Sequence, residues 1–272
     1  KLGMPVGEKP VMQPWRDFLD KKKHAKETIR IGLVGKYVEL PDAYKSINES
    51  LLQAATYNER KLDLHFVLSD KLTAENVEKT LSSFDGIVIA PGFGQRGVEG
   101  KILALKYTRE HDVPTFGICL GMQCMVVEFA RNVLGLEDAN STEMNPHTPY
   151  KVIDLMEEQK NITNMGGTMR LGAYKCELEK GSLVYKAYGK KLVEERHRHR
   201  FEFNGDYKED YEKNGMKCSG INPDMGLVEV VEMPGKKWYL GVQFHPEYNS
   251  TVLSPNPLFI SFIKAVVENK KK

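Results

Sequence analysis

Hydrophobic positions along the chain form short apolar runs, and segments of helical period lie between them. The first run, over 29–34, is rich in β-branched residues and ends at Gly35, which is typical of a strand in a parallel sheet. Three similar runs and four helical segments, the first with Asp42 at its N-cap, follow in alternation. The later strands are predicted over 62–68, 86–90 and 115–118, and the helices over 42–60, 73–81, 97–110 and 121–133.

This alternation with short connections predicts an α/β fold with an open, mostly parallel central sheet and helices on both of its faces. The second half is less regular, because 140–172 is rich in Asn, Thr, Pro and Gly and shows little periodicity. Strands predicted over 194–203, 226–233 and 237–244 indicate an added antiparallel strand region. A closing helix is predicted over 258–268.

The first 28 residues read as a linker, because they contain Pro5, Pro10 and Pro14 and end in a lysine-rich run. A short helix is predicted within them, over 15–23. We therefore expect an interdomain linker over 1–28 and a single domain over 29–272. Since the chain opens without a methionine, we also expect it to be a fragment of a longer protein.

Composition narrows the class of protein. The chain has 272 residues, 41% of them hydrophobic and 28% charged, with a net charge of +2. This near-balance argues against a nucleic-acid or membrane-surface partner, and no run reaches the roughly 18 apolar residues of a membrane span. The four cysteines form no CxxC pair, so neither a metal site nor a disulfide framework is expected, and reduced cytoplasmic thiols are the default.

One cysteine has the surroundings of a nucleophile. Cys119 follows an apolar strand, precedes a helix and is flanked by Gly117 and Gly121, which is the pattern of a nucleophile elbow. A helix N-terminus favours a thiolate, and the backbone N–H of Leu120 is placed to stabilise an oxyanion. The alternative is a buried core cysteine, which is common after a strand, and this motif alone leaves the two interpretations about equal.

Two further segments support the first interpretation. Ala90–Gly94 follows the preceding strand, and Gly92 is placed to bring a second N–H against the same oxyanion. The alternative is an ordinary turn between a strand and a helix. His245 and Glu247 flank Pro246 at the end of another strand, and on an extended chain their side chains share one side. Glu247 can then orient His245, whose other ring nitrogen faces the thiol.

The densest charge cluster is 196–202, in which three arginines alternate with two histidines. As a strand it presents the arginines on one face and the histidines on the other. A solvated edge strand and a weak nucleic-acid patch are alternative interpretations. In a nearly neutral protein, one arginine that binds a substrate carboxylate fits the size of the cluster better.

Together these motifs resemble the class I, triad-type glutamine amidotransferases. The two main markers are the Gly117–Gln123 run and the His245–Glu247 run, in this order along the chain. Four further segments narrow the resemblance to the glutaminase domains of the CTP synthase family. These segments are Val34–Ser46, Arg96–Lys101, Met165–Gly172 and Glu195–Glu202.

The resemblance implies a specific chemistry for the motifs. Cys119 would attack the side-chain amide of L-glutamine, and a γ-glutamyl thioester would form and be hydrolysed to glutamate. His245 would transfer the proton to ammonia, and Glu247 would complete the triad. The expected substrate contacts are Gly92 and Leu120 at the oxyanion, Phe93 in the pocket wall, Gln123 and Glu143 at the amino group, and Arg200 with the backbone of Phe201 at the carboxylate.

The resemblance also implies a larger enzyme. Ammonia would pass to a synthase domain that precedes this chain, where ATP-dependent amination converts UTP to CTP. ATP, magnesium and a GTP effector are expected for that whole enzyme, with a homotetrameric assembly, and no cofactor is expected in this domain. The loop over 96–99 matches the region implicated in the GTP effect.

One departure from the family pattern concerns the oxyanion turn. The family usually reads Pro-Gly-Gly-Phe-Gly, whereas this chain has Ala90 and Pro91 before Gly92. The length is kept, so we expect Gly92 to hold its position and function to be retained. The rival functions are a regulatory module that kept the fold without the chemistry, and a free-standing hydrolase of γ-glutamyl compounds.

Overall fold

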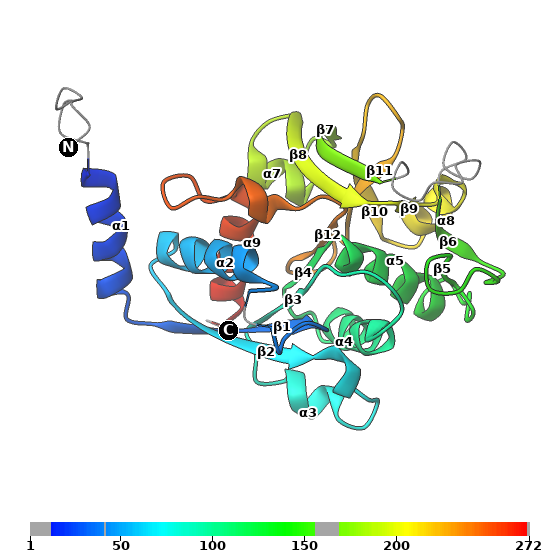
Figure 1. Cartoon of the computed structure of the whole chain (residues 1–272), viewed down its shortest axis with the longest axis horizontal. Coiled ribbons are helices and arrows are strands. Elements are labelled where there is room, and N and C mark those ends of the chain that lie inside the picture. Colours follow the sequence, from blue (N-terminus) through cyan, green and yellow to red (C-terminus); the bar gives the residue numbers. More distant parts are fainter. Residues whose placement is uncertain (1–11, 41, 156–168, 271–272) are drawn as a thin grey trace, which may run out of the picture.

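The computed structural model describes residues 12–40, 42–155 and 169–270. Parts of three predicted features therefore lie outside the described residues: the start of the linker, Pro41, and 165–168 of one family segment. The described chain forms two sheets with helices packed around the larger one (Figure 1). The α/β class predicted from the alternating pattern is confirmed.

A nine-stranded sheet forms the centre of the molecule. The first five strands in its spatial order are mutually parallel, and the other four pair antiparallel with their neighbours. The parallel strands are β2 (Lys61–Leu68), β1 (Thr28–Gly35), β3 (Gly86–Ile89), β4 (Thr115–Ile118) and β12 (Tyr239–Val242). The antiparallel strands follow as β11 (Val228–Glu232), β10 (Lys217–Ile221), β7 (Arg170–Leu178) and β8 (Leu192–His199).

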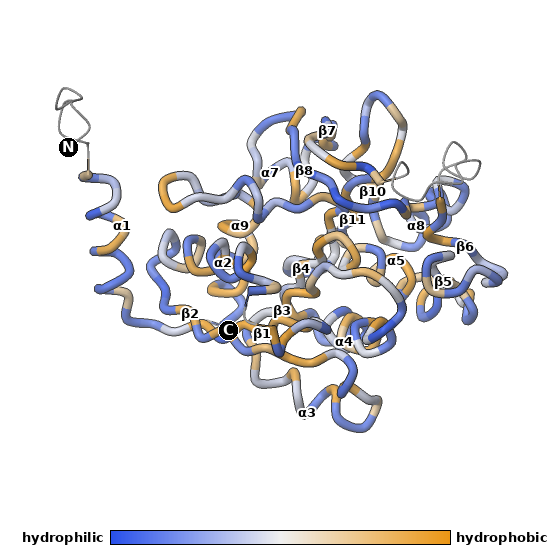
Figure 2. The backbone as a smooth tube through the Cα atoms, viewed as in Figure 1, coloured by the Kyte–Doolittle hydropathy of each residue, from blue (hydrophilic) through white to orange (hydrophobic). Residues whose placement is uncertain are grey.

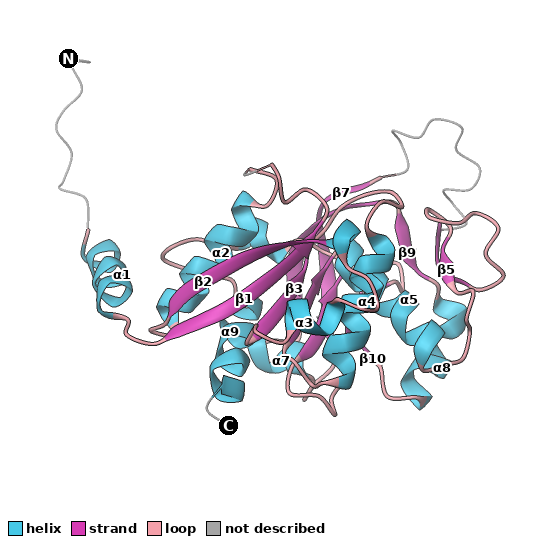
Figure 3. Ribbon diagram, turned by 90° about the horizontal axis from the view of Figure 1, so that it is seen from below, coloured by secondary structure: helices cyan, strands magenta, loops and turns pink. Residues whose placement is uncertain are grey.

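Two apolar clusters pack against this sheet, one on each face. The inner strands β3, β4 and β12 are buried at every residue. Figure 2 shows the hydropathy of the residues along the backbone. Figure 3 shows the helices around the fan of strands. One cluster includes α3 (Val77–Leu81), α4 (Val98–Glu110) and α5 (Leu120–Asn132), and the other includes α2 (Lys45–Tyr57), α7 (Leu183–Tyr188) and α9 (Pro257–Lys270).

A smaller sheet lies beside α5 and consists of β5 (Asn140–Ser141), β6 (Lys151–Leu155) and β9 (Phe201–Phe203). The short helix α8 (Lys208–Lys213) follows it in the chain. The hydrophobic pattern did not predict β5, β6, β7, α7, α8 or β10. Except for β7, which has nine residues, these elements are short and contain few periodic positions.

Two predicted helix starts are wrong. The helix predicted over 42–60 begins at Lys45, and Tyr44 rather than Asp42 occupies its N-cap. The hydroxyl of Tyr44 instead accepts hydrogen bonds from the N–H groups that follow β1. The helix predicted over 73–81 begins only at Val77, because the side chain of Asn76 accepts a hydrogen bond from the N–H of Thr73 and holds a turn there.

The strand predicted over 194–203 is interrupted at Arg200. Strand β8 ends at His199 in the large sheet, and β9 begins at Phe201 in the small sheet, so the chain changes sheets at this one residue. The predicted alternation holds within β8, where Arg196 and Arg198 are exposed and the histidines are buried.

The predicted helix near the N-terminus is confirmed as α1 (Gln13–His24), which contains no buried residue. It stands apart from the sheet and is joined to β1 by a short extended segment (Figure 1). Two 3-10 turns follow strands of the large sheet: η1 (Ser69–Lys71) comes after β2, and η4 (Pro246–Asn249) comes after β12.

Candidate active site

Cys119 lies at the sharp turn between β4 and α5. Its backbone has φ 52° and ψ −106°, a strained conformation that non-glycine residues rarely adopt. The turn packs too closely for a side chain at position 121, since a Cβ atom on Gly121 would lie 2.2 Å from the carbonyl oxygen of Ile89. The expected role of the flanking glycines is therefore visible in the contacts. A strained cysteine at a helix N-terminus is typical of a nucleophile.

The end of β12 brings His245 to this turn. The N–H of Cys119 donates to the carbonyl of Val242 at 2.7 Å, and His245 follows three residues later. Its Nδ1 atom lies 2.7 Å from Oε1 of Glu247. The expected extended geometry is wrong, because η4 begins at Pro246 and the 3-10 turn brings the carboxylate back to the ring. The contact itself is present.

The two ring nitrogens of His245 have different surroundings. Its Nε2 atom is buried and has no hydrogen-bond partner among the described residues. Burial lowers the pKa of His245, but the negative charge of the Cys119 sulfur and the Glu247 carboxylate outweigh burial and raise the pKa to about 11. The environment therefore favours the imidazolium form of His245.

A narrow pocket opens beside the sulfur of Cys119. All but one of the expected substrate contacts line it, and the exception, Leu120, is placed by its backbone as the first residue of α5. The N–H groups of Gly92 and Leu120 make no hydrogen bond within the described parts of the chain. The pocket is lined by Gly92, Phe93, Cys119, Gln123, Glu143, His199, Arg200 and Phe201.

The turn that carries Gly92 is held from two sides. The ammonium of Lys36 donates to the carbonyls of Phe93 and, at 2.6 Å, Gly94. The N–H of Gly94 donates to Oε1 of Glu143 at 2.7 Å. Burial lowers the pKa of Lys36. Pro91, where the family has glycine, leaves Gly92 in the pocket wall, as expected.

Gln243, which the motif analysis did not single out, connects the nucleophile to the pocket. Its Nε2 atom lies 3.8 Å from the Cys119 sulfur, and its Oε1 atom accepts from Gln123 at 3.1 Å. The same amide of Gln123 donates to the carbonyl of Phe201 at 2.9 Å. The position of Gln243, two residues before the histidine and on its side of the strand, is the signal that could have found it.

A buried charged cluster supports the wall formed by the β8–β9 junction. Arg170 binds Glu202 at 3.0 Å and Glu229 at 2.8 Å, and His197 lies 2.8 Å from His199 between their ring nitrogens. Burial raises the pKa of Glu202 to about 8, against the opposing effect of Arg170. Burial also lowers the pKa of both histidines, so they remain neutral. His199 reaches the pocket, which the predicted alternation of charges did not indicate.

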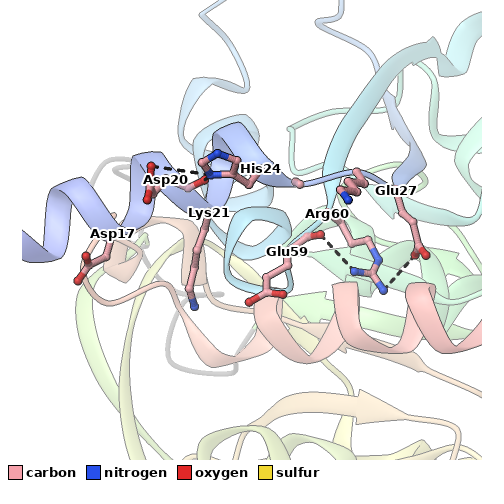
Figure 4. A pocket seen from close by; sticks show the side chains of 9 residues that line it. Asp17, Asp20, Lys21, His24, Glu27, Glu59 and Arg60 are labelled. Carbon is pink, nitrogen blue, oxygen red and sulfur yellow. Dashed lines mark hydrogen bonds and ion pairs between the residues drawn. The ribbon is translucent and has the colours of Figure 1, made fainter.

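A second hollow lies far from this site, where α1 meets the start of β1 (Figure 4). Its side chains are charged and pair with one another, as Arg60 does with Glu27 at 3.1 Å and His24 with Asp20. It contains no cysteine or serine. Within the described residues, no cluster of three or more potential metal ligands is present, and no helix has the length and apolarity needed to cross a membrane.

Comparison with known proteins places the chain among related sequences. A model of the family Glutamine amidotransferase class-I matches residues 39–265. The CTP synthase of Bacteroides fragilis is 64% identical over 98% of this chain and 50% of its own length, and that of Porphyromonas gingivalis is 63% identical over 100% and 50%. The chain thus spans about half the length of these curated relatives.

Solved structures agree with the sequence relatives. The glutaminase domain of Trypanosoma brucei CTPS with bound acivicin superposes with a TM-score of 0.84 and 39% identity, over 89% of this chain and 94% of that one. A glutamine amidotransferase from Thermotoga maritima has a TM-score of 0.53 and 12% identity over 89% of this chain and 98% of that one, so it shows the shared fold alone.

Proposed function

The chain belongs to the class I glutamine amidotransferase family, as a relative of CTP synthase glutaminase domains, and on this basis we propose that it hydrolyses L-glutamine through a thioester on Cys119. One observation carries the proposal. A strained cysteine at a helix N-terminus lies beside a buried histidine whose other nitrogen is hydrogen-bonded to a carboxylate. This arrangement supplies a nucleophile, a proton carrier and the group that orients it.

The first half of the reaction forms the thioester. The Cys119 thiolate attacks the amide carbon of glutamine, and the carbonyl electrons move to oxygen. The N–H groups of Gly92 and Leu120 would bind this oxyanion, and removal of one such donor typically costs about 10²–10³ in rate. Nε2 of His245 gives its proton to the amide nitrogen. The carbon–nitrogen bond then breaks, ammonia departs and the γ-glutamyl thioester remains.

The second half releases glutamate. The neutral imidazole of His245 takes a proton from water, and the resulting hydroxide attacks the thioester carbon. When the tetrahedral intermediate collapses, the carbon–sulfur bond breaks and the Cys119 thiolate is regenerated. Glu247 keeps the ring in one orientation during both halves, because it binds Nδ1 and leaves Nε2 for the proton transfers.

Substrate recognition follows from the lining of the pocket. Arg200 and the backbone at Phe201 would bind the α-carboxylate, and Gln123 and Glu143 would accept hydrogen bonds from the amino group. One oxygen of Glu143 already binds the N–H of Gly94, so substrate binding and the oxyanion turn share this carboxylate. Phe93 supplies an apolar side to the mouth of the pocket, where the residue is 39% exposed.

The fate of the ammonia is a further part of the proposal. The curated relatives that carry the name CTP synthase are about twice as long as this chain. We propose that the ammonia serves the ATP-dependent amination of UTP to CTP in a synthase domain of the same protein. ATP, magnesium, the GTP effector and the tetramer would belong to that larger assembly.

The test of hydrolysis is glutamate release by the chain and by Cys119→Ala. We expect release that saturates with glutamine in the first and none above background in the second. Cys124→Ala is a matched control, since Cys124 is buried one turn further along α5. Equal release by the chain and Cys119→Ala would overturn the assignment of the nucleophile.

A further inference from the structure

Lys101 is a buried cation without an obvious counter-charge. Its side chain, on the first turn of α4, is fully buried, and its Nζ atom donates to the carbonyl of Ala90 at 2.5 Å. No carboxylate among the described residues lies within ion-pair distance of it. Burial of an unpaired ammonium destabilises the folded state, so such a residue is usually found where its charge has a function.

The charged and titratable groups around Lys101 come from four elements. They are Cys124 on α5, Lys36 after β1, Cys119 at the elbow and Asp70 in η1. Burial lowers the pKa of Lys101 to about 8, with Lys36 acting in the same direction and the two sulfur atoms and Asp70 opposing it. Lys101 therefore keeps its positive charge at neutral pH.

Only one of the two neighbouring sulfur atoms can use that charge at neutral pH. Burial raises the pKa of Cys124 to about 11, so this thiol stays neutral. Cys119 lies at the N-terminus of α5, a position that stabilises a negative charge on a thiol. Of the two sulfur atoms, that of Cys119 is therefore the one whose negative charge Lys101 would stabilise.

Lys101 also contacts the start of the oxyanion turn. In the β3–β4 pairing Ile89 lies opposite Gly117, so Ala90 and Cys119 leave adjacent strands at the same edge of the sheet. Neighbouring strands are about 4.8 Å apart. The carbonyl that Lys101 holds belongs to Ala90, two residues before Gly92.

We propose that Lys101 is a positioning residue whose buried positive charge favours the thiolate of Cys119 and the oxyanion formed on its substrate. It acts through Cys119 and the Ala90–Gly92 turn, and no substrate contact is required of it. The inference rests on the proposed function, because the effect of Lys101 on catalysis requires Cys119 to be the nucleophile for glutamine. Its test does not, because alkylation of Cys119 can be followed without glutamine.

The experiment measures the rate of Cys119 alkylation by iodoacetamide against pH, read from the mass of the peptide that contains Cys119. The variants are Lys101→Met, which removes both the charge and the hydrogen bond, and Lys101→Gln, which removes the charge and keeps a donor. Loss of the charge should move the midpoint of the alkylation rate upward by roughly one pH unit. Lys106→Met, on the exposed side of the same helix, is the matched control.

We expect both Lys101 variants to shift the midpoint upward and Lys106→Met to leave it in place. An unchanged midpoint in the folded Lys101→Gln variant would overturn the proposal, even if Lys101→Met shifts, because the hydrogen bond alone would then explain the effect. Thermal unfolding establishes whether each variant is folded. If Lys101→Met does not fold, the midpoint of Lys101→Gln alone decides the outcome. Failure of the wild-type chain to release glutamate would refute the proposed function and leave this measurement valid.

Discussion

Nδ1 of His245 lies 2.7 Å from Oε1 of Glu247, and a 3-10 turn rather than an extended strand brings the two side chains together. Both residues are about 95% buried, so the contact is protected from solvent. A hydrogen bond in which the acceptor is ionised is stronger than a neutral one, and it orients the ring. Glu247 thereby leaves Nε2 of His245 as the nitrogen that exchanges protons with the reacting groups.

The first prediction concerns Glu247→Gln. The substitution keeps the shape of the side chain but removes its charge, so the imidazolium loses stabilisation and the ring loses its fixed orientation. We expect kcat for glutamine hydrolysis to fall by about 10²–10⁴. KM should change little, because Glu247 does not line the pocket. Steady-state kinetics would contradict this role if KM rose while kcat stayed the same.

The second prediction concerns the titration of His245. The pKa of this residue is raised to about 11, and the charge of Cys119 is the largest cause that acts upward. In Cys119→Ala this cause is absent, so the pKa should fall. Imidazole resonances followed by NMR should show His245 protonated through pH 9 in the wild-type chain and titrating at lower pH in the variant. Identical titration in both proteins would rule out a charged pair.

The interactions of His245 with Cys119 and Glu247 also make the stability of the fold depend on pH. Because the pKa in the folded state lies above the ordinary value of 6.5, they stabilise the fold fully below about pH 6.5. That contribution is lost as pH rises through about 11.

A third prediction concerns the glycine after the nucleophile. In Gly121→Ala the new Cβ would lie 2.2 Å from the carbonyl oxygen of Ile89, and backbone must move to relieve the clash. We expect a loss of several kcal/mol of stability, about 2–4 or more, as for other severe overpacking. Gly205→Ala is the control, since nothing lies within 4 Å of its new Cβ. Equal urea midpoints for the two variants would contradict the packing of the elbow.

The fourth prediction is the stability effect of Lys101→Met. The pKa of Lys101 in the folded state is about 8, below its ordinary 10.5, so its charge destabilises the fold below pH 8 by about 3 kcal/mol. This penalty disappears as pH rises from 8 to 10.5. Loss of the hydrogen bond to Ala90 costs about 1–3 kcal/mol at any pH.

The variant should therefore be as stable as the wild type or up to about 2 kcal/mol more stable at pH 7, and less stable than the wild type at pH 10. Urea unfolding at both pH values measures the difference. A difference that is the same at pH 7 and pH 10 would show that the charge of Lys101 does not destabilise the fold.

Much of the parallel half of the fold could be predicted from the chain. Strand β4 occurs at the predicted residues, 115–118, because its apolar run is bounded by Pro114 and the elbow. The contacts of the elbow could also be anticipated, since Gly117 and Gly121 mark a turn with close packing on both sides. These features depend on local sequence, which hydrophobic period and turn residues describe well.

Features that depend on tertiary contacts could not be predicted. The break at Arg200 arises because β8 and β9 pair with different partners, and no local breaker residue marks it. The burial of Lys101 is similarly invisible, since a lysine on an amphipathic helix is normally assigned to the solvent face. The contact of Gln243 with Cys119 depends on which strand lies beside β4. That neighbour, β12, comes more than 100 residues later in the chain.

The most direct test of the central claim, that Cys119 is the nucleophile for glutamine, is covalent labelling with the glutamine-like electrophile acivicin, read by intact and peptide mass. We predict one adduct per chain, located on Cys119, formed more slowly in the presence of glutamine and absent in Cys119→Ala. The other three cysteines should stay unmodified, because burial raises the pKa of each of them. A folded chain that acquires no adduct on Cys119, or acquires one that glutamine does not slow, would contradict the account.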